Sequence, residues 1–230
     1  MLFRQLIDAQ TSTYTYLLAD LSTRDAVLID PVKGQVSLYL KLLEELELRL
    51  SHALDTHVHA DHVTALGMLR DLTHCRTYIG HEGSVSCSDE SLEEGMLIPF
   101  GSYGLRVRYT PGHTDDSHCF VLEGAPSKTV FTGDTLLIRG SGRTDFQNGS
   151  SSDLYNSLHN ILLELDGDTQ VYPGHDYQGM TVSSISEERH HNPRLQWSKE
   201  EFIRQMDSLE LPNPKFIDIA VPANLQCGKS

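Results

Sequence analysis

The most informative segment of the 230-residue chain is Thr56-His57-Val58-His59-Ala60-Asp61-His62. It contains three imidazoles and one carboxylate, so four potential metal ligands lie within six residues, which chance does not readily give. It follows a strand-like run over 51–55 and precedes a helical pattern over 63–72. In a tight loop the alternate side chains of His57 and His59 can point one way while Asp61 and His62 turn another, so one loop can serve one or two metal ions. A solvated polar turn would explain two such residues, but it explains four poorly.

Three later segments each place one potential ligand after a glycine, at the end of a strand-like run. They are Pro111-Gly112-His113-Thr114, Thr132-Gly133-Asp134-Thr135 and Tyr172-Pro173-Gly174-His175-Asp176-Tyr177. Glycine allows the tight backbone turn that brings such a loop close to a shared centre. A single Gly-His or Gly-Asp pair is usual in ordinary turns, so only the whole series carries weight.

The apolar pattern around these segments alternates between strands and helices. Strand-like runs cover 14–18 and 26–30 as a hairpin, and then 51–55, 105–109, 118–122, 129–131 and 170–172. Helical patterns cover 35–48, 63–72, 153–165 and 199–209. Two strand-rich blocks, each followed by helices, predict an α/β fold in four layers, αββα, with two sheets face to face. We expect one domain over 1–230 with an irregular, proline-containing tail from about residue 211.

Composition restricts the possible partners. The formal charge of −14 argues against a nucleic acid or an anionic membrane surface, because both require a cationic face. An anionic substrate remains compatible, since a metal ion and a few arginines can reverse the potential inside a cleft. No segment has membrane-spanning length and no signal sequence is recognisable, so we expect a cytoplasmic protein.

The four cysteines, Cys75, Cys87, Cys119 and Cys227, contain no Cys-x-x-Cys pair. Their number and spacing predict neither a disulfide framework nor a structural zinc site, and they favour a reducing compartment. We expect them to be small buried hydrophobic residues, with Cys119 and Cys227 oxidisable if they are exposed.

In their order from His57 to His175, the ligand segments resemble those of the metallo-β-lactamase superfamily. That resemblance implies the αββα sandwich, with a metal centre at one edge of the two sheets. The superfamily includes hydrolases, flavodiiron proteins and dioxygenases, so the fold alone leaves the reaction open.

Further motifs are similar to those of the persulfide dioxygenase family. They are Gly140-Ser141-Gly142-Arg143-Thr144-Asp145-Phe146-Gln147, Asn192-Pro193-Arg194-Leu195 and Ile217-Asp218-Ile219-Ala220-Val221-Pro222-Ala223-Asn224. The resemblance extends from Phe3 to about Gly228. Family members often carry Cys where this chain has Ser141, which leaves the reaction class intact but affects how a sulfur substrate would pack.

The resemblance implies one iron(II) per chain, held by His57, His113 and Asp134. Two imidazoles and a carboxylate on one side leave room for both substrate and dioxygen. It also implies an outer group that orients ligands and water without a second metal: His59, Asp61, His62 and His175. The implied reaction converts glutathione persulfide and O2 to sulfite and glutathione, and the implied assembly is a homodimer.

Glutathione carries two carboxylates, so its pocket needs cations and an aromatic wall. Arg143 is the first candidate, because it replaces a Lys of the related hydroxyacylglutathione hydrolases and can hold a carboxylate bidentately. Tyr177 is the aromatic candidate, and Asn192 and Arg194 are further ones. A surface salt bridge is the alternative interpretation of both arginines.

Two other functions compete with this one. A dinuclear zinc hydroxyacylglutathione hydrolase would use every ligand of the series, although the segment from Arg143 to Phe146 departs from the Lys-containing turn of those enzymes. A non-catalytic module that binds metal and carries persulfide sulfur to a partner protein is the second alternative.

Overall fold

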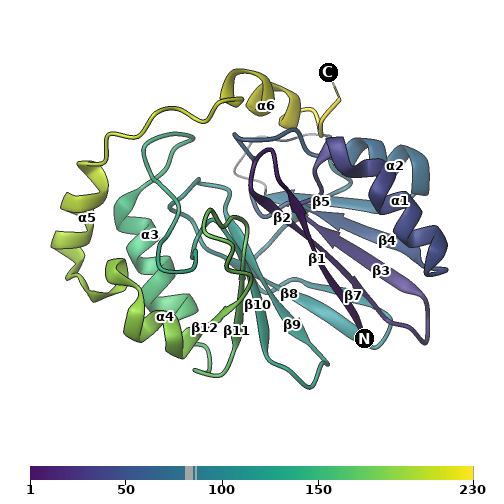
Figure 1. Cartoon of the computed structure of the whole chain (residues 1–230), viewed down its shortest axis with the longest axis horizontal. Helices are drawn as coiled ribbons and strands as arrows, with labels where there is room; N and C mark the ends of the chain where they lie inside the picture. Colours follow the sequence, from purple (N-terminus) through teal and green to yellow (C-terminus); the bar gives the residue numbers. More distant parts are fainter. Residues whose placement is uncertain (81–84, 86, 230) are drawn as a thin grey trace.

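Two sheets face each other, and helices cover their outer sides (Figure 1). The computed structural model describes residues 1–80, 85 and 87–229. The first sheet has the order β1-β2-β3-β4-β5-β6: Leu2–Asp8, Thr13–Ala19, Asp25–Ile29, Arg49–Leu54, Arg76–Gly80 and Glu90–Leu92. The second has the order β12-β11-β10-β9-β8-β7: Ser183–Ser184, Gln170–Pro173, Thr129–Gly133, His118–Glu123, Tyr103–Tyr109 and Leu97–Phe100. The predicted four-layer fold is therefore confirmed.

The helices form the outer layers. The 3-10 turn Lys33–Gln35, α1 (Val36–Glu45) and α2 (Leu66–Thr73) lie on the first sheet. On the second sheet lie α3 (Ser151–Ser157), which continues as a π-helical turn over Leu158–Leu162, α4 (Ile185–His191), the 3-10 turn Pro193–Gln196 and α5 (Lys199–Asp207). No helix of the described residues is long and apolar enough to cross a membrane.

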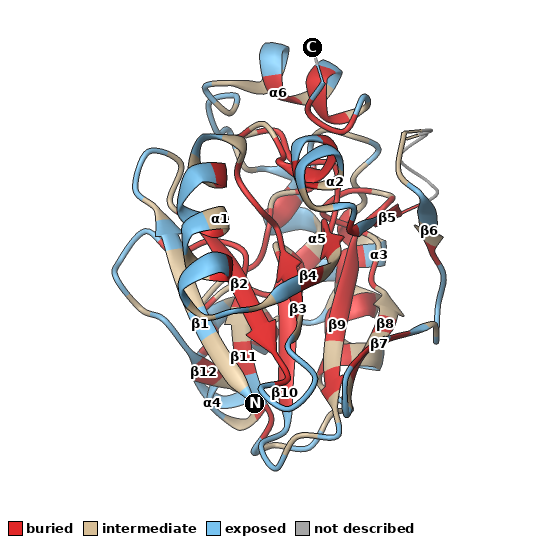
Figure 2. Cartoon of the chain, turned by 90° about the vertical axis from the view of Figure 1, so that its right-hand side faces the viewer, coloured by how far each residue is buried: buried red, intermediate tan, exposed pale blue. Residues whose placement is uncertain are grey.

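Apolar side chains fill the three spaces between the layers. Between the sheets, aromatic residues such as Tyr16, Phe120 and Phe131 pack with aliphatic ones. The central strands β2, β3 and β10 are buried along their length (Figure 2). Burial on both faces explains the continuous apolar run from Ala26 to Ile29, which pairs with β2 on one side and with β4 on the other.

The strand directions gather the four ligand segments at one edge. β3 and β4 are parallel, and so are β10 and β11. β8 and β10 are each antiparallel to β9, so these two also point the same way. Residues 56–62, here called the histidine loop, and the three glycine-containing segments lie at the carboxyl ends of β4, β8, β10 and β11. Loops that follow such ends are where α/β sheets place their ligands.

The sequence predicted an irregular tail from about residue 211, but part of this tail is helical. Residues Ile217–Asn224 form helix α6, in which Ala220, Ala223 and Asn224 are buried. Pro222 lies inside this helix. A proline costs the helix a hydrogen bond, and the packing of the buried face offsets that loss, which composition alone does not reveal.

The expectation of four unpaired cysteines is wrong for two of them. Cys87 and Cys227 form a disulfide with their Cα atoms 5.9 Å apart, across a sequence separation of 140 residues. Cys75 and Cys119 are free and buried, as predicted. The pairing was not visible in the sequence because only the folded chain brings α6 next to the segment before β6.

We expect the Cys87→Ser variant to lose about 3 kcal/mol of unfolding free energy, since a cross-link across a long loop restricts the unfolded chain. Urea unfolding without reductant measures the loss. Dithiothreitol should lower the stability of the parent to that of the variant and leave the variant unchanged. Equal stability of the two proteins without reductant would contradict the prediction.

Candidate metal centre

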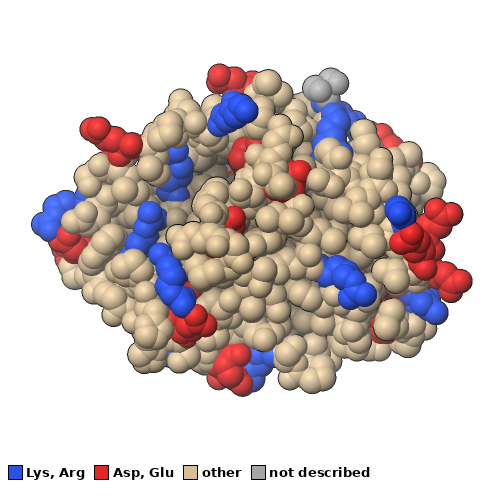
Figure 3. All heavy atoms as spheres, in the orientation of Figure 1, with Lys and Arg blue, Asp and Glu red and all other residues tan. Residues whose placement is uncertain are grey.

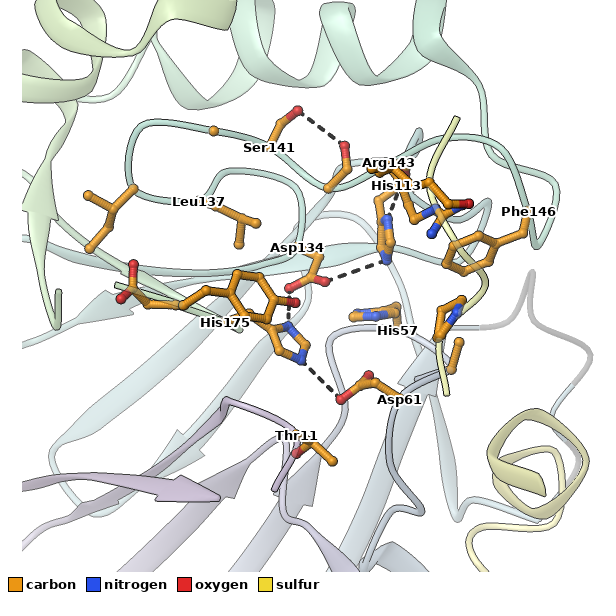
Figure 4. Close-up of a pocket in the computed structure, with 18 of the residues that line it drawn as sticks. Thr11, His57, Asp61, His113, Asp134, Leu137, Ser141, Arg143, Phe146 and His175 are labelled. Carbon is orange, nitrogen blue, oxygen red and sulfur yellow. Dashed lines mark hydrogen bonds and ion pairs between the residues drawn. The ribbon is translucent and has the colours of Figure 1, made fainter. Parts of the chain in front are cut away.

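Three side chains from three loops converge at the edge described above. His57 follows β4, His113 follows β8 and Asp134 follows β10. One ligand atom from each lies within 4.8 Å of the others. Figure 4 shows the two imidazoles and the carboxylate directed toward one another. The structure thus brings together the three residues proposed from the sequence as metal ligands.

Hydrogen bonds fix which nitrogen each imidazole presents. The Nδ1 of His113 donates to the carbonyl oxygen of Arg143 at 2.7 Å, so its Nε2 keeps a lone pair, 3.7 Å from Asp134 Oδ2. The Nδ1 of His57 lies 3.0 Å from Thr56 Oγ1, and that hydroxyl donates to Asp30 Oδ2. Thr56 therefore accepts from His57, whose Nε2 is also free to bind a metal.

The protonation states suit metal binding. Burial lowers the pKa of both His57 and His113, so these imidazoles are neutral. Burial alone would raise the pKa of Asp134, but the charge and hydrogen bond of His175 outweigh it and hold that pKa below its usual range. Two neutral nitrogen donors and one carboxylate fit a divalent iron ion with positions left for other ligands.

A second group lies beside the first. His59, Asp61 and His62 also offer ligand atoms within 4.8 Å of one another. His175 joins the two groups: its Nδ1 lies 2.7 Å from Asp134 Oδ1 and its Nε2 lies 3.0 Å from Asp61 Oδ2 (Figure 4). Burial would lower the pKa of His175, but the two carboxylates raise it well above the usual value. His175 is therefore a cation that donates to both carboxylates.

Polar contacts that the sequence did not suggest support both groups. Asp30, at the end of β3, accepts from the Thr56 amide at 2.7 Å and lies 3.2 Å from His59 Nε2. Burial would lower the pKa of His59, but Asp30 outweighs it and the pKa rises to about 9. Thr13 Oγ1 donates to Asp61 Oδ2 at 3.0 Å. The only sequence signal for Asp30 was its position at a strand end before proline.

Asn224 of α6, although distant in sequence, holds the histidine loop by hydrogen bonds. Its Nδ2 donates to the carbonyl oxygens of His59 and His62, each at 2.8 Å. Its Oδ1 accepts from the Thr64 amide at 2.8 Å. All three bonds are buried, so they fix the backbone of the loop. The sequence marked Asn224 as part of a motif without giving it a role.

Glycine is required at the ligand segments for space as well as for backbone conformation. Gly112 and Gly133 have φ values of +137° and +49°, in the region that disfavours other residues. A Cβ atom on Gly174 would lie 2.8 Å from Asp134 Oδ1 and 3.0 Å from the Gly133 carbonyl carbon. Close approach of these loops is what aligns Asp134 with the imidazoles.

We expect the Gly174→Ala variant to bind metal roughly tenfold more weakly, because the methyl group displaces the Asp134 carboxylate. Titration of the metal-free protein with iron(II) under anaerobic conditions measures the change. Gly34→Ala is the matched control, since a Cβ there meets nothing within 4 Å. Equal affinity of the two variants would show that Asp134 does not depend on this contact.

A cavity of about 650 Å³ opens on the three ligands. Its wall includes Phe146, Tyr177, Arg143, Arg194 and residues of the segment between α5 and α6. On the face drawn in Figure 3, basic side chains border a hollow beneath that segment. The overall charge is negative, yet the cavity has cations in its wall, as an anionic substrate requires.

The proposed substrate residues differ in their placement. Tyr177 lines the cavity, is 74% exposed, and stacks on His175 with ring centroids 6.1 Å apart. Arg194 lines it too, and its Nη1 donates to both the carbonyl and the hydroxyl oxygen of Ser141. Arg143 lines it but pairs with Asp145.

Asn192 does not line the cavity, so the prediction that it contacts substrate is corrected. It is fully buried, and its Nδ2 donates to Gly140 O at 3.0 Å and to Glu188 Oε2 at 2.9 Å. Its Oδ1 accepts from the Arg194 amide. Asn192 therefore supports the backbone behind the cavity wall.

Comparisons with known proteins agree with this geometry. The sequence model of the metallo-β-lactamase superfamily matches residues 9–175. Persulfide dioxygenase ETHE1 of Homo sapiens is 48% identical over 229 residues, which cover 99% of this chain and 89% of that protein. The hydroxyacylglutathione hydrolase of Francisella tularensis subsp. novicida is 34% identical over 175 residues, covering 76% and 67% of the two chains.

Among solved structures, ETHE1 from Myxococcus xanthus superposes with a TM-score of 0.95 at 53% identity, covering 99% of this chain and 100% of that one. The match extends through the segments after residue 175, which carry Arg194 and Asn224. Both resemblances noted in the sequence are thereby confirmed. This chain belongs to the metallo-β-lactamase superfamily and, within it, to the persulfide dioxygenase family.

Proposed function

We propose that the chain oxidises glutathione persulfide with dioxygen and water to glutathione and sulfite, using one iron(II) held by His57, His113 and Asp134. The sulfane sulfur loses the electrons that dioxygen gains, its bond to the glutathione sulfur breaks, and glutathione leaves as the thiol. Bound iron would supply the redox chemistry that lets dioxygen react with closed-shell sulfur, which zinc cannot do.

One observation carries the proposal that the ion is held by His57, His113 and Asp134. His57 and His113 both have Nδ1 engaged and Nε2 free, facing Asp134. His175, by contrast, has both ring nitrogens engaged by Asp134 and Asp61. In this arrangement the first group is ready to bind a metal, and His175 acts as a hydrogen-bonded support. We propose the same supporting role for His59, Asp61 and His62.

Arg194 is the best-placed cation for a glutathione carboxylate. Its guanidinium is half-buried, and no carboxylate pairs with it among the described residues. Burial lowers the pKa of Arg194, because desolvation penalises the charged form. An unpaired buried cation is costly, and a substrate carboxylate would relieve that cost. Tyr177 would supply the aromatic wall beside it.

The decisive experiment is metal analysis of anaerobically purified protein combined with oxygen uptake on glutathione persulfide. We expect one iron per chain and an amount of sulfite proportional to the oxygen consumed. Two zinc ions per chain, no oxygen uptake and hydrolysis of a glutathione thioester would overturn the proposal. That outcome would identify the dinuclear hydrolase, for which the His59, Asp61 and His62 group offers a second site.

A single turnover with the iron-loaded chain tests the remaining alternative. Sulfite formed by the chain alone supports the enzyme. If persulfide sulfur is bound and passed on without sulfite, the chain is a non-catalytic sulfur carrier.

We also propose that the protein is a cytoplasmic homodimer. The homodimer is implied by the family resemblance. The cytoplasmic location rests on the lack of a recognisable signal sequence and not on the cysteines, because Cys87 and Cys227 form a disulfide. Sedimentation velocity would test the first, with a monomer at micromolar concentration as the contrary result. Cell fractionation would test the second.

A further inference from the structure

A short segment between α5 and α6 crosses the mouth of the cavity. Residues 211–216, here called the strap, contribute five side chains to the cavity wall: Leu211, Pro212, Pro214, Lys215 and Phe216. Figure 1 shows this part of the chain running over the top of the molecule between the two helices. Its two prolines restrict the backbone, so the strap is a stiff connection.

Arg143 fastens the strap to the loop after β10. Its Nη1 donates to Pro212 O at 2.7 Å and its Nη2 donates to Leu211 O at 3.1 Å. Its Nε and Nη2 also donate to the two carboxylate oxygens of Asp145, at 2.6 and 2.5 Å. A guanidinium has five N–H donors, and these contacts engage all except one on Nη1. The charge of Arg143 is balanced as well.

The four cations in the cavity wall differ in whether a carboxylate neutralises them. Arg139 pairs with Glu187 and Glu188, and Arg143 pairs with Asp145. Arg194 and Lys215 have no carboxylate partner in the part of the chain that the structure describes. Arg194 lies half-buried, whereas Lys215 is exposed on the strap, with its Nζ 5.2 Å from the ring centroid of Phe216.

We propose that Lys215 is a specificity-determining residue that binds one carboxylate of the glutathione moiety at the cavity mouth, and that Arg143 is a positioning residue that holds the strap. The inference rests on the proposed function. A substrate with two carboxylates matches the two unpaired cations, one deep and one at the rim. The strap residues are also the part of the wall most remote in sequence from the metal ligands.

The first test separates the charge of the substrate from the charge of the chain. Iron-loaded parent and Lys215→Gln proteins are assayed with glutathione persulfide and with the persulfide of glutathione diethyl ester. We expect Lys215→Gln to raise KM for the diacid roughly fivefold with little change in kcat, the effect of losing an exposed ion pair. KM for the diester should not rise.

Lys41→Gln is the matched control, because Lys41 is an exposed residue of α1 outside the cavity wall. It should leave KM for both substrates unchanged. An unchanged KM for the diacid in Lys215→Gln, or an equal rise for the diester, would overturn the role of Lys215.

The second test concerns Arg143. If Arg143 acts through the strap, the Arg143→Met and Lys215→Gln changes will not be additive, and the double variant will have the KM of Arg143→Met. Amide hydrogen exchange over 211–216 should increase in Arg143→Met and stay unchanged in Lys215→Gln. If the two KM effects multiply and exchange is unaffected, Arg143 contacts the substrate directly and the positioning role is refuted.

Calorimetric binding of reduced glutathione to the same proteins distinguishes this inference from the proposed function. A parent that consumes no oxygen but binds glutathione more tightly than Lys215→Gln would refute the dioxygenase proposal and support the strap. A parent that oxidises the persulfide with no dependence on Lys215 would support the dioxygenase proposal and refute the role of Lys215. A parent that neither oxidises nor binds would refute both.

Discussion

The Asp134→Ala variant should lose bound iron and at least about 99% of its dioxygenase activity. Even the loss of a residue that only orients a metal ligand costs about 10- to 100-fold in affinity or activity, and Asp134 would be a ligand itself. It is also the anionic member of the set and the partner of His175. Its removal therefore takes away a donor and leaves the His175 cation with one carboxylate fewer. Iron content and oxygen uptake measure the two losses.

Asp168→Ala is the matched control, because Asp168 is an exposed carboxylate that pairs with Lys128 away from the centre. It should retain parental iron content and activity. Circular dichroism should show that both variants are folded. An Asp134→Ala protein that keeps one tightly bound iron would refute the assignment of Asp134 as a ligand.

The Asn224→Ala variant should lose roughly 4 kcal/mol of unfolding free energy. The change leaves the carbonyls of His59 and His62 and the amide of Thr64 buried without their partner. Each buried polar group left unsatisfied costs about 1 to 3 kcal/mol. The histidine loop should also become less ordered, so we expect weaker iron binding. Urea unfolding and iron titration measure the two effects.

Asn213→Ala is the control for Asn224→Ala, since Asn213 is exposed on the strap. Its stability should remain within about 0.5 kcal/mol of the parent, as for other surface substitutions. If Asn224→Ala is as stable as Asn213→Ala, the carbonyl groups of His59 and His62 find other partners and the hydrogen bonds of Asn224 are not needed for stability.

The position and order of the ligand segments could be predicted because they are local features. A glycine, a strand end and a ligand side chain occur within a few residues, as at Gly133 and Asp134. The layers could be predicted as well, since the apolar pattern of α1 or β3 can be recognised within one short stretch of sequence. The π-helical continuation of α3 and the helix α6 were missed, because packing there overrides local preference.

The sequence could not distinguish the role of Arg143 from that of Arg194. Arg143 and Arg194 look equivalent in the sequence as cations near the ligand segments. In the fold, Arg143 contacts Asp145 and the strap, whereas the guanidinium of Arg194 donates to Ser141 and to the carbonyl oxygen of Gly142. The difference depends on which segments lie opposite each guanidinium, and those segments are distant along the chain.

The residue types alone therefore specified a histidine- and aspartate-based metal centre on an αββα sandwich, since donor chemistry and short-range spacing are properties of neighbouring residues. The fold specified which nitrogen of His113 is free, that Cys87 bonds Cys227, and that Asn224 holds the histidine loop. Each of these is a contact between residues at least 30 positions apart. Such contacts exist only once the layers have packed, because hydrogen bonds and cross-links of this kind require atoms to meet at short distance and fixed angle.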